Sequence, residues 1–169
     1  MKTVQDLRHF SSGIYEPYIF VSYSHDDKDT VEKLVNWLLE DGYCVWVDYE
    51  NIRGRYFSDD IKNGIRECAV FLQCLSKSYI TKPYCEKEYK LADDENKGIV
   101  PVAIDDVKKN DNPNLFPYGG NIHGYGSGMR DDFEECYSRV VKSALLLKLK
   151  QGENPGYMFA GEEILEEFK

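Results

Sequence analysis

The sequence predicts an α/β fold in which a mostly parallel β-sheet is covered by helices on both faces. Short apolar segments rich in β-forming residues alternate with helical patterns along most of the chain. These segments are apolar almost throughout, so their strands are buried on both sides, as in parallel sheets with right-handed crossovers. A length of 169 residues, 42% hydrophobic and 30% charged, suits one globular domain with a substantial core.

The first strand and helix have the clearest pattern. Residues 18–22 (YIFVS) are too few for a helix and are followed by a polar cluster at 24–27, which predicts a buried strand. Asp29 and Glu32 form a capping pair for the next helix. Its apolar stripe has helical spacing and consists of Val31, Leu34, Val35, Leu38 and Leu39.

The same unit recurs along the chain. Further strands are predicted at 43–47, 69–75 and 98–104, and further helices at 58–68 and 83–96, with Pro83 in the first turn of the second. Residues 105–129 form a long loop with room for a fifth short strand. One long helix, whose buried stripe runs from Phe133 to Leu145, follows this loop.

These elements predict a flavodoxin-like three-layer sandwich with about five strands in the order 2-1-3-4-5. Ligands of such sheets bind beyond the carboxyl ends of the strands, where successive crossovers go to opposite faces. That crevice would lie between the first and third strands. Residues 23–27 and 76–88 would form its walls, and the loop at 48–57 would be a neighbouring flap.

The charge balance argues against nucleic acids and membrane surfaces as partners. The chain has 30 acidic and 21 basic residues, a net charge of −9, and its lysines and arginines are scattered among acids. No apolar run approaches the roughly 18 residues of a membrane span, and the first residues lack the apolar stretch of a secretory signal. We therefore expect a cytoplasmic protein.

The cysteines are expected to be reduced core thiols. Cys44, Cys68, Cys74, Cys85 and Cys136 form an odd set without a close pair of the kind that binds metals. A buried thiol behaves as a small hydrophobic side chain. We therefore predict neither a disulfide nor a metal site.

Glu88 is the residue that most suggests a site. In the helix from Pro83, offsets of three and four residues place Glu88 on one face with Tyr84, Leu91 and Ala92, which is otherwise apolar. A carboxylate on a core-facing stripe is costly unless it meets a partner or a substrate. The alternatives are that Glu88 caps neighbouring backbone amides or lies in water at the boundary.

The loop after the first strand allows several interpretations. Asp26 and Asp27 resemble the acidic corner of a phosphoacceptor receiver, but the third strand ends in Ser76 rather than aspartate, so we expect solvated loop acids. His25 is either a catalytic acid or base or simply an exposed side chain. In the flap, Arg53 and Gly54 form either a turn with solvated arginines or a contact with a phosphate or a partner's acids.

Four segments together resemble a Toll/interleukin-1 receptor (TIR) domain, in its bacterial form. They are FVSYSHDD at 20–27, VWVD at 45–48, the loop around Gly54, and residues 76–89 with the motif YCEKE at 84–88. The resemblance covers about residues 18–147. It divides the chain into an N-terminal leader at 1–16, a TIR domain at 17–150 and an acidic tail or linker at 151–169.

The resemblance implies an enzyme that cleaves NAD⁺ at the nicotinamide–ribose bond and needs no further cofactor. It makes Glu88 the catalytic residue and places Tyr23, Ser24 and Tyr84 near the nicotinamide, with Ser76 in the same crevice. Arg53 and Gly54 would act as a flap and an assembly surface, because TIR enzymes commonly complete their site across two chains. The product would be ADP-ribose or a cyclic isomer, which signals to a downstream effector in immunity or antiviral defence.

Two other functions stay open at this point. One is a non-catalytic interaction module that assembles through TIR–TIR contacts, for which a carboxylate on the inner face of the helix is unnecessary. The other is a base-exchange or nucleotide-sugar transferase, which would turn over nucleosides without NAD⁺. The sequence decides neither between hydrolysis and cyclisation nor on the trigger or the oligomeric form.

Overall fold

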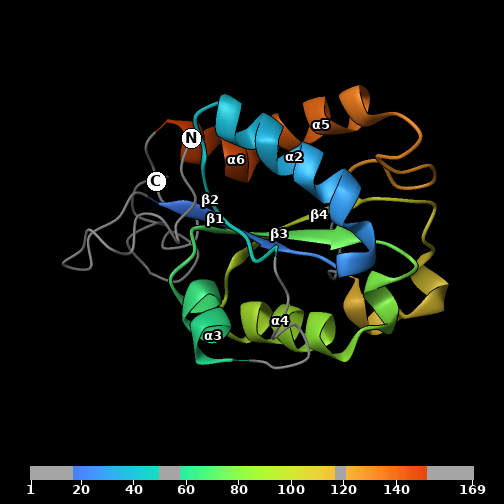
Figure 1. Cartoon of the computed structure of the whole chain (residues 1–169), viewed down its shortest axis with the longest axis horizontal. Helices are drawn as coiled ribbons and strands as arrows, with labels where there is room; N and C mark the ends of the chain where they lie inside the picture. Colours follow the sequence, from blue (N-terminus) through green and yellow to red (C-terminus); the bar gives the residue numbers. More distant parts are fainter. Residues whose placement is uncertain (1–16, 50–57, 117–120, 152–169) are drawn as a thin grey trace, which may run out of the picture.

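A parallel sheet forms the centre of the molecule (Figure 1). The computed structural model describes residues 17–49, 58–116 and 121–151. Within these residues the sheet has four strands in the order β2-β1-β3-β4, and each neighbouring pair is parallel. The strands are β1 (Tyr18–Ser22), β2 (Cys44–Trp46), β3 (Val70–Leu75) and β4 (Gly98–Ala103).

Helices cover both faces of this sheet, which confirms the predicted flavodoxin-like three-layer sandwich. One face carries α2 (Lys28–Glu40), α5 (Phe133–Val141) and α6 (Ala144–Lys150), and the other carries α3 (Asp59–Arg66) and α4 (Pro83–Asp94) (Figure 1). In the part of the chain that the structure describes, four short 3-10 helices connect these elements: η2 (His25–Asp27), η3 (Tyr79–Thr81), η4 (Lys109–Asp111) and η5 (Pro113–Leu115).

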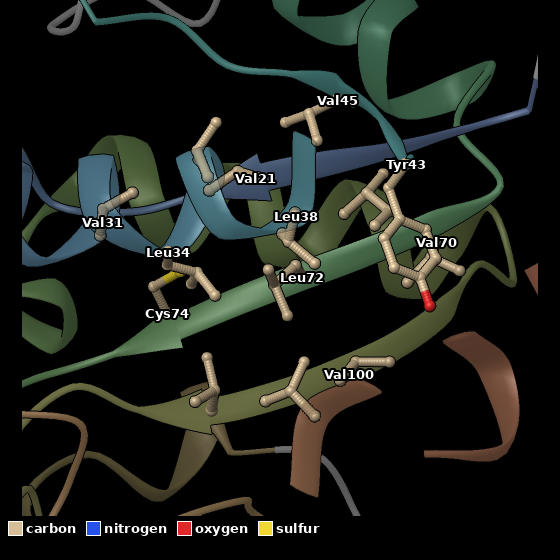
Figure 2. Packing of buried hydrophobic residues seen from close by; sticks show 14 of the residues in the cluster. Val21, Val31, Leu34, Leu38, Tyr43, Val45, Val70, Leu72, Cys74 and Val100 are labelled. Carbon is tan, nitrogen blue, oxygen red and sulfur yellow. The ribbon is translucent and has the colours of Figure 1, made fainter. Parts of the chain in front are cut away.

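The strands separate two hydrophobic cores, because successive side chains of a strand point to opposite faces. Ile19 and Val21 of β1 belong to the core beneath α2 and α5, part of which Figure 2 shows. Phe20 points the other way and stacks on Trp46 and Phe71, with ring centroids 4.6 and 5.6 Å away. The side of β1 on which a residue lies therefore decides which helices it meets.

The last predicted helix is two helices. The expected single helix through Leu145 is wrong, because α5 ends at Val141 and α6 begins at Ala144. Ser143, the residue before α6, has extended backbone angles and donates a hydrogen bond from its side chain to the carbonyl of Val140, at 2.6 Å. Serine competes for backbone groups in this way and ends helices that an apolar pattern alone would continue.

The fifth strand is also absent from the described residues, although its place beside β4 is occupied. His123 forms a single parallel bridge with Val102, exchanging backbone hydrogen bonds with Pro101 and Ala103. Gly124 follows at once with a positive φ of 76°, so the extended conformation ends there. One bridge replaces the strand that the sequence predicted.

Three further expectations concern the two ends of the chain, the cysteines and membrane-spanning helices. The predicted leader at 1–16 lies outside the described residues, as does the predicted tail at 151–169 apart from Gln151. All five cysteines are free and buried. No helix in the described ranges is both long and apolar enough to cross a membrane.

Replacing Gly128 by alanine is expected to destabilise the fold by more than the same change at Gly126. Both glycines have positive φ angles, 91° and 105°, which cost a residue with a side chain roughly 1–2 kcal/mol. A Cβ at Gly128 would also lie 2.5–2.6 Å from backbone atoms of Asp105, whereas one at Gly126 would meet nothing within 4 Å.

The backbone overlap should therefore add roughly 1–3 kcal/mol at Gly128 alone. Urea denaturation of the two variants, followed by circular dichroism, measures the difference in the free energy of unfolding. Equal destabilisation by the two changes would contradict the proposed close packing of Gly128 against Asp105.

Candidate active site

Glu88 is a buried carboxylate in the helix that covers β1. Pro83 begins α4 at a position where a missing N–H costs nothing, so Glu88 lies in the second turn. The buried face of α4 consists of Cys85, Glu88, Tyr89 and Ala92, and only 7% of the surface of Glu88 is exposed. Tyr84, which the sequence placed on the same face, lies at its margin and is partly exposed.

A chain of hydroxyl groups reaches Glu88 from the sheet. The Oγ atom of Ser22, the last residue of β1, donates a hydrogen bond to Oε1 of Glu88 at 2.7 Å. The Tyr79 hydroxyl lies 2.8 Å from the same Oγ atom. Because the single Ser22 proton is used toward Glu88, the Tyr79 hydroxyl is the donor in this second contact. The hydroxyls thus support negative charge on Glu88.

Burial nevertheless favours the neutral form of this carboxyl group. Loss of solvent, with a smaller contribution from the negative charge of Asp48, raises the pKa of Glu88 from 4.5 to about 8, and the Ser22 hydrogen bond opposes this rise. A strongly perturbed carboxyl group beside a cavity is typical of functional sites.

Aromatic and polar side chains near Glu88 line a small pocket. Tyr23, His25, Trp46, Asp48 and Tyr84 surround it together with Glu88, and its volume is about 20 Å³. This is room for about one water molecule. The pocket lies over the ends of β1 and β2, whereas the sequence analysis expected the crevice between β1 and β3.

Three aromatic side chains of the pocket lining contact one another. The His25 ring stacks on Tyr23 at a centroid distance of 4.7 Å and meets Tyr84 edge-on at 6.5 Å. The backbone N–H of His25 donates to the Tyr84 hydroxyl at 3.3 Å, and Tyr23 donates to the backbone carbonyl of Asp48 at 2.6 Å. Burial lowers the pKa of His25, so its imidazole is neutral at pH 7. A ligand larger than water needs this lining to move apart, because the volume of the pocket is only about 20 Å³.

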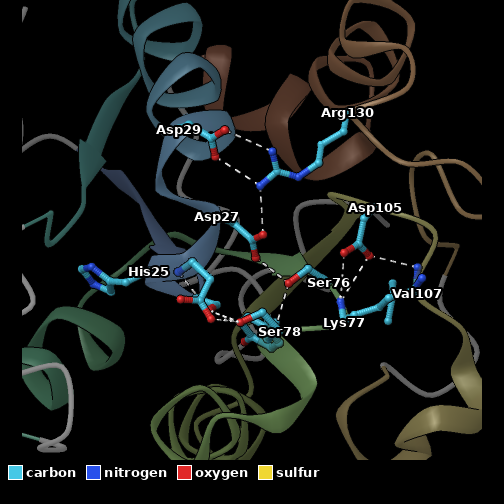
Figure 3. A network of polar contacts seen from close by, with 12 residues as sticks. His25, Asp27, Asp29, Ser76, Lys77, Ser78, Asp105, Val107 and Arg130 are labelled. Atoms are coloured by element: carbon cyan, nitrogen blue, oxygen red, sulfur yellow. Dashed lines mark hydrogen bonds and ion pairs between the residues drawn. The ribbon is translucent and has the colours of Figure 1, made fainter.

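Two of the predicted substrate-binding residues lie beside this pocket rather than in it. The Ser24 hydroxyl contacts the hydroxyl of Ser78 at 2.6 Å and accepts from the backbone N–H of Asp26. Ser76 donates to the buried carboxylate of Asp27 at 2.5 Å (Figure 3). Ser24 and Ser76 thus connect the two loops that follow β1 and β3, and neither lines the pocket around Glu88.

Asp27 is buried, in contrast to the solvated loop acid that the sequence suggested. Only 5% of its surface is exposed, and an Arg130 guanidinium nitrogen lies 3.1 Å from its carboxylate and equally close to that of Asp29 (Figure 3). Burial raises the pKa of Asp27, while Ser76 and Arg130 oppose the rise. Arg130, whose positive charge offsets the cost of burying Asp27, is 103 residues away in the sequence.

A family model for the TIR domain matches residues 19–141. The chain belongs to the TIR domain family. Comparison with curated protein sequences gives no match.

Among solved structures, the TIR fold of this chain is similar to that of the TIR domains in a structure described as the activated Roq1 resistosome directly recognizing the pathogen effector XopQ. The sequence identity is 19%, the match covers 81% of each chain, and the TM-score is 0.51. At this identity the likeness shows a shared fold.

Within this TIR domain, Tyr23, Tyr84 and Glu88 are the predicted site residues that the fold brings together. Arg53 and Gly54 lie outside the described residues. Ser22 and Tyr79 were not among the residues predicted from the sequence; they contact one another, and Ser22 contacts Glu88. The two-residue period of β1, which places Ser22 on the same side as Phe20, was the signal that could have found Ser22.

Proposed function

We propose that this TIR domain cleaves NAD⁺ at the nicotinamide–ribose bond. The observation that carries the proposal is the buried Glu88 carboxylate in the lining of an aromatic pocket, held by the Ser22 hydroxyl at 2.7 Å. A module that served only for protein contacts would gain nothing from a carboxyl group with a strongly raised pKa at this position. The TIR domain resemblance of the motif at 84–88 supports the same assignment.

The reaction breaks the bond between the ribose C1′ atom and the nicotinamide nitrogen. Nicotinamide leaves as a neutral molecule with the electron pair of that bond, so no proton needs to be supplied to it. Positive charge develops on the ribose, as in glycoside cleavage. An ionised Glu88 stabilises this charge electrostatically and accepts hydrogen bonds from the ribose hydroxyls.

The second half of the reaction decides the product. Attack of water on C1′ forms a C–O bond, releases one proton and gives ADP-ribose. Attack by a nucleophilic atom of the same molecule gives a cyclic isomer instead, and exclusion of water favours that outcome. The pocket has room for about one water molecule, so its lining has to move apart before the nicotinamide end is admitted.

The aromatic walls suit the charge of the substrate. The nicotinamide ring of NAD⁺ is cationic, and the faces of Tyr23, Tyr84 and Trp46 attract cations. Asp48 adds negative charge on the same side of the pocket. This charge distribution favours NAD⁺ over neutral nucleosides, which distinguishes the proposal from a nucleoside transferase.

The proposal is tested by incubating the wild-type protein with NAD⁺ over a wide range of protein concentrations, with and without a crowding agent. Chromatography should show release of nicotinamide together with ADP-ribose or a cyclic isomer. Absence of nicotinamide at every concentration would overturn the proposal. Release of nicotinamide only from nucleosides would favour the transferase alternative.

Self-association is a second proposed property of this chain, supported by the likeness to TIR domains in an activated resistosome. A pocket of only about 20 Å³ is consistent with a site that widens on assembly. Light scattering during the concentration series should show oligomers at the concentrations that release nicotinamide. Oligomers without any cleavage would favour the non-catalytic module, and the search for contacts should then turn to Arg53 and Gly54.

Changing Ser22 to alanine is expected to move the pH dependence of cleavage upward. Loss of the hydrogen bond to buried Glu88 removes roughly 1.5–3 kcal/mol of support for the charged form, which raises the pKa by roughly one to two units. The rise of kcat/KM with pH should therefore move from about 8 by that amount. Tyr79→Phe is the matched control, because it leaves the Ser22–Glu88 hydrogen bond in place. An unchanged pH profile in Ser22→Ala would contradict the assigned contact.

A further inference from the structure

A second cavity, of about 590 Å³, lies near His123 and the end of α5. It is separate from the Glu88 pocket, because His123 bridges to the edge strand β4, whereas the Glu88 pocket lies over β1 and β2. Cavities of roughly 300–1,000 Å³ are typical of small-molecule sites. Nothing in the proposed cleavage of NAD⁺ uses this space.

Basic side chains from two distant segments meet around this cavity. Lys109 comes from η4, and Arg139 and Lys142 come from the end of α5. No carboxylate belongs to the lining formed by the described residues, although the whole chain has a net charge of −9. Glu135 accepts one hydrogen bond from Nε of Arg139 at 3.0 Å, and a guanidinium group has five N–H donors. The cavity is therefore a local site of positive charge.

An aromatic and apolar wall faces this charge. Tyr125 is 43% exposed, and its hydroxyl accepts a hydrogen bond from the backbone N–H of Lys109 at 3.0 Å. Ile122 and His123 continue the wall, and burial together with the charge of Arg139 lowers the pKa of His123, so its imidazole is neutral at pH 7. An exposed tyrosine beside an isoleucine offers a surface on which a flat ring can stack.

We propose that this cavity binds a nucleotide with at least two phosphate groups. Arg139 and Lys142 would contact the phosphates, and Tyr125 and Ile122 would contact the base. Arginine binds phosphate oxygens with two parallel hydrogen bonds, and lysine adds a mobile point charge. The volume accommodates a nucleoside diphosphate, whereas the Glu88 pocket at about 20 Å³ does not. This inference is independent of the proposed NAD⁺ cleavage.

Isothermal titration calorimetry of the purified chain with ADP, adenosine and pyrophosphate tests the proposal. ADP should bind at least tenfold more tightly than either fragment, because adenosine lacks the phosphates and pyrophosphate lacks the base. The double change Arg139→Gln and Lys142→Gln should weaken ADP binding at least tenfold. Both residues are exposed, so the variant should fold, and circular dichroism checks this.

The matched control is the double change Lys87→Gln and Lys90→Gln in α4, on the other face of the sheet. It removes the same charge and also breaks one ion pair between residues four apart, since Lys90 pairs with Glu86 as Arg139 pairs with Glu135. This control and Glu88→Gln should each leave ADP affinity within about twofold of wild type.

Four results would overturn the proposal. The first three are no ADP binding at millimolar concentrations, unchanged ADP affinity in the Arg139 and Lys142 variant, and binding of adenosine or pyrophosphate as tight as that of ADP. The fourth is loss of ADP binding in Glu88→Gln with retention in the Arg139 and Lys142 variant, which would place ADP at the Glu88 pocket instead.

Discussion

Replacing Glu88 by glutamine is expected to reduce NAD⁺ cleavage by at least about a hundredfold. The substitution keeps the size of the side chain and an oxygen that can accept the hydrogen bond from Ser22, but it removes the negative charge. Groups aimed at developing charge in a dry site contribute roughly 10²–10³ to the rate. Nicotinamide release at saturating NAD⁺, followed by chromatography, measures the loss.

The matched control for this change is Glu86→Gln, two residues earlier in α4. Glu86 lies on the outside of the helix, where it pairs with Lys90 at 3.5 Å. Its replacement by glutamine therefore removes an equal charge without changing the lining of the pocket. It should keep cleavage within about twofold of wild type. Comparable activity in Glu88→Gln and Glu86→Gln would remove Glu88 from the mechanism, even if the wild type cleaves NAD⁺.

The same substitution should change how the stability of the protein depends on pH. Burial raises the pKa of Glu88 from 4.5 to about 8, so between these values the native state holds a proton that the unfolded chain has already released. Wild-type stability therefore falls as pH rises through this window, by up to about 1.4 kcal/mol per pH unit from this group. Glu88→Gln lacks the group and lacks that slope.

Urea denaturation of both proteins at pH 5.5, 6.5 and 7.5 isolates this effect, because every other titrating group is common to both. The stability of Glu88→Gln relative to wild type should increase by roughly 2–3 kcal/mol over this range. The difference should level off above pH 8, where Glu88 ionises in the native state as well. A constant difference at all pH values would show that Glu88 is ionised throughout.

The pH dependence of cleavage and the pH dependence of stability both reflect the ionisation of Glu88. At pH 7 about a tenth of the native molecules hold an ionised Glu88, given a pKa of about 8. The cationic nicotinamide ring favours the ionised form when it binds. Cleavage should therefore begin at lower pH with saturating NAD⁺ than kcat/KM of the free enzyme indicates.

The sequence predicted the parts of this structure that depend on local periodicity. The strands at 18–22 and 98–104 were found because strands buried on both sides are continuous apolar runs, and the helix carrying Val31 and Leu38 because one buried face imposes a regular spacing of apolar residues. Glu88 was found for the same reason, as an exception within such a face. The break at Ser143 was missed because the apolar pattern continues across it.

Contacts between distant segments could not be predicted in this way. The burial of Asp27 depends on Arg130, and the sequence between them gives no sign of their meeting. The position of the pocket over β1 and β2 depends on the side chains of Tyr23, Trp46 and Tyr84, which come from three separate segments of the chain. A hydrophobic pattern shows which face is buried but not which polar groups meet there.

The hydrogen bond between Ser22 and Glu88 joins a central strand to a packed helix, so the carboxylate is anchored on the least deformable part of the molecule. The rings of His25 and Tyr84 belong to the short 3-10 helix η2 and to the first turn of α4, where rearrangement is easier. Selectivity would then depend on the width of the ligand's end group. Because Glu88 does not move toward the ligand, only an end group narrow enough to reach it reacts. Dinucleotide analogues with bulkier rings in place of nicotinamide should compete with NAD⁺ for binding beside His25 and Tyr84 but should not be cleaved.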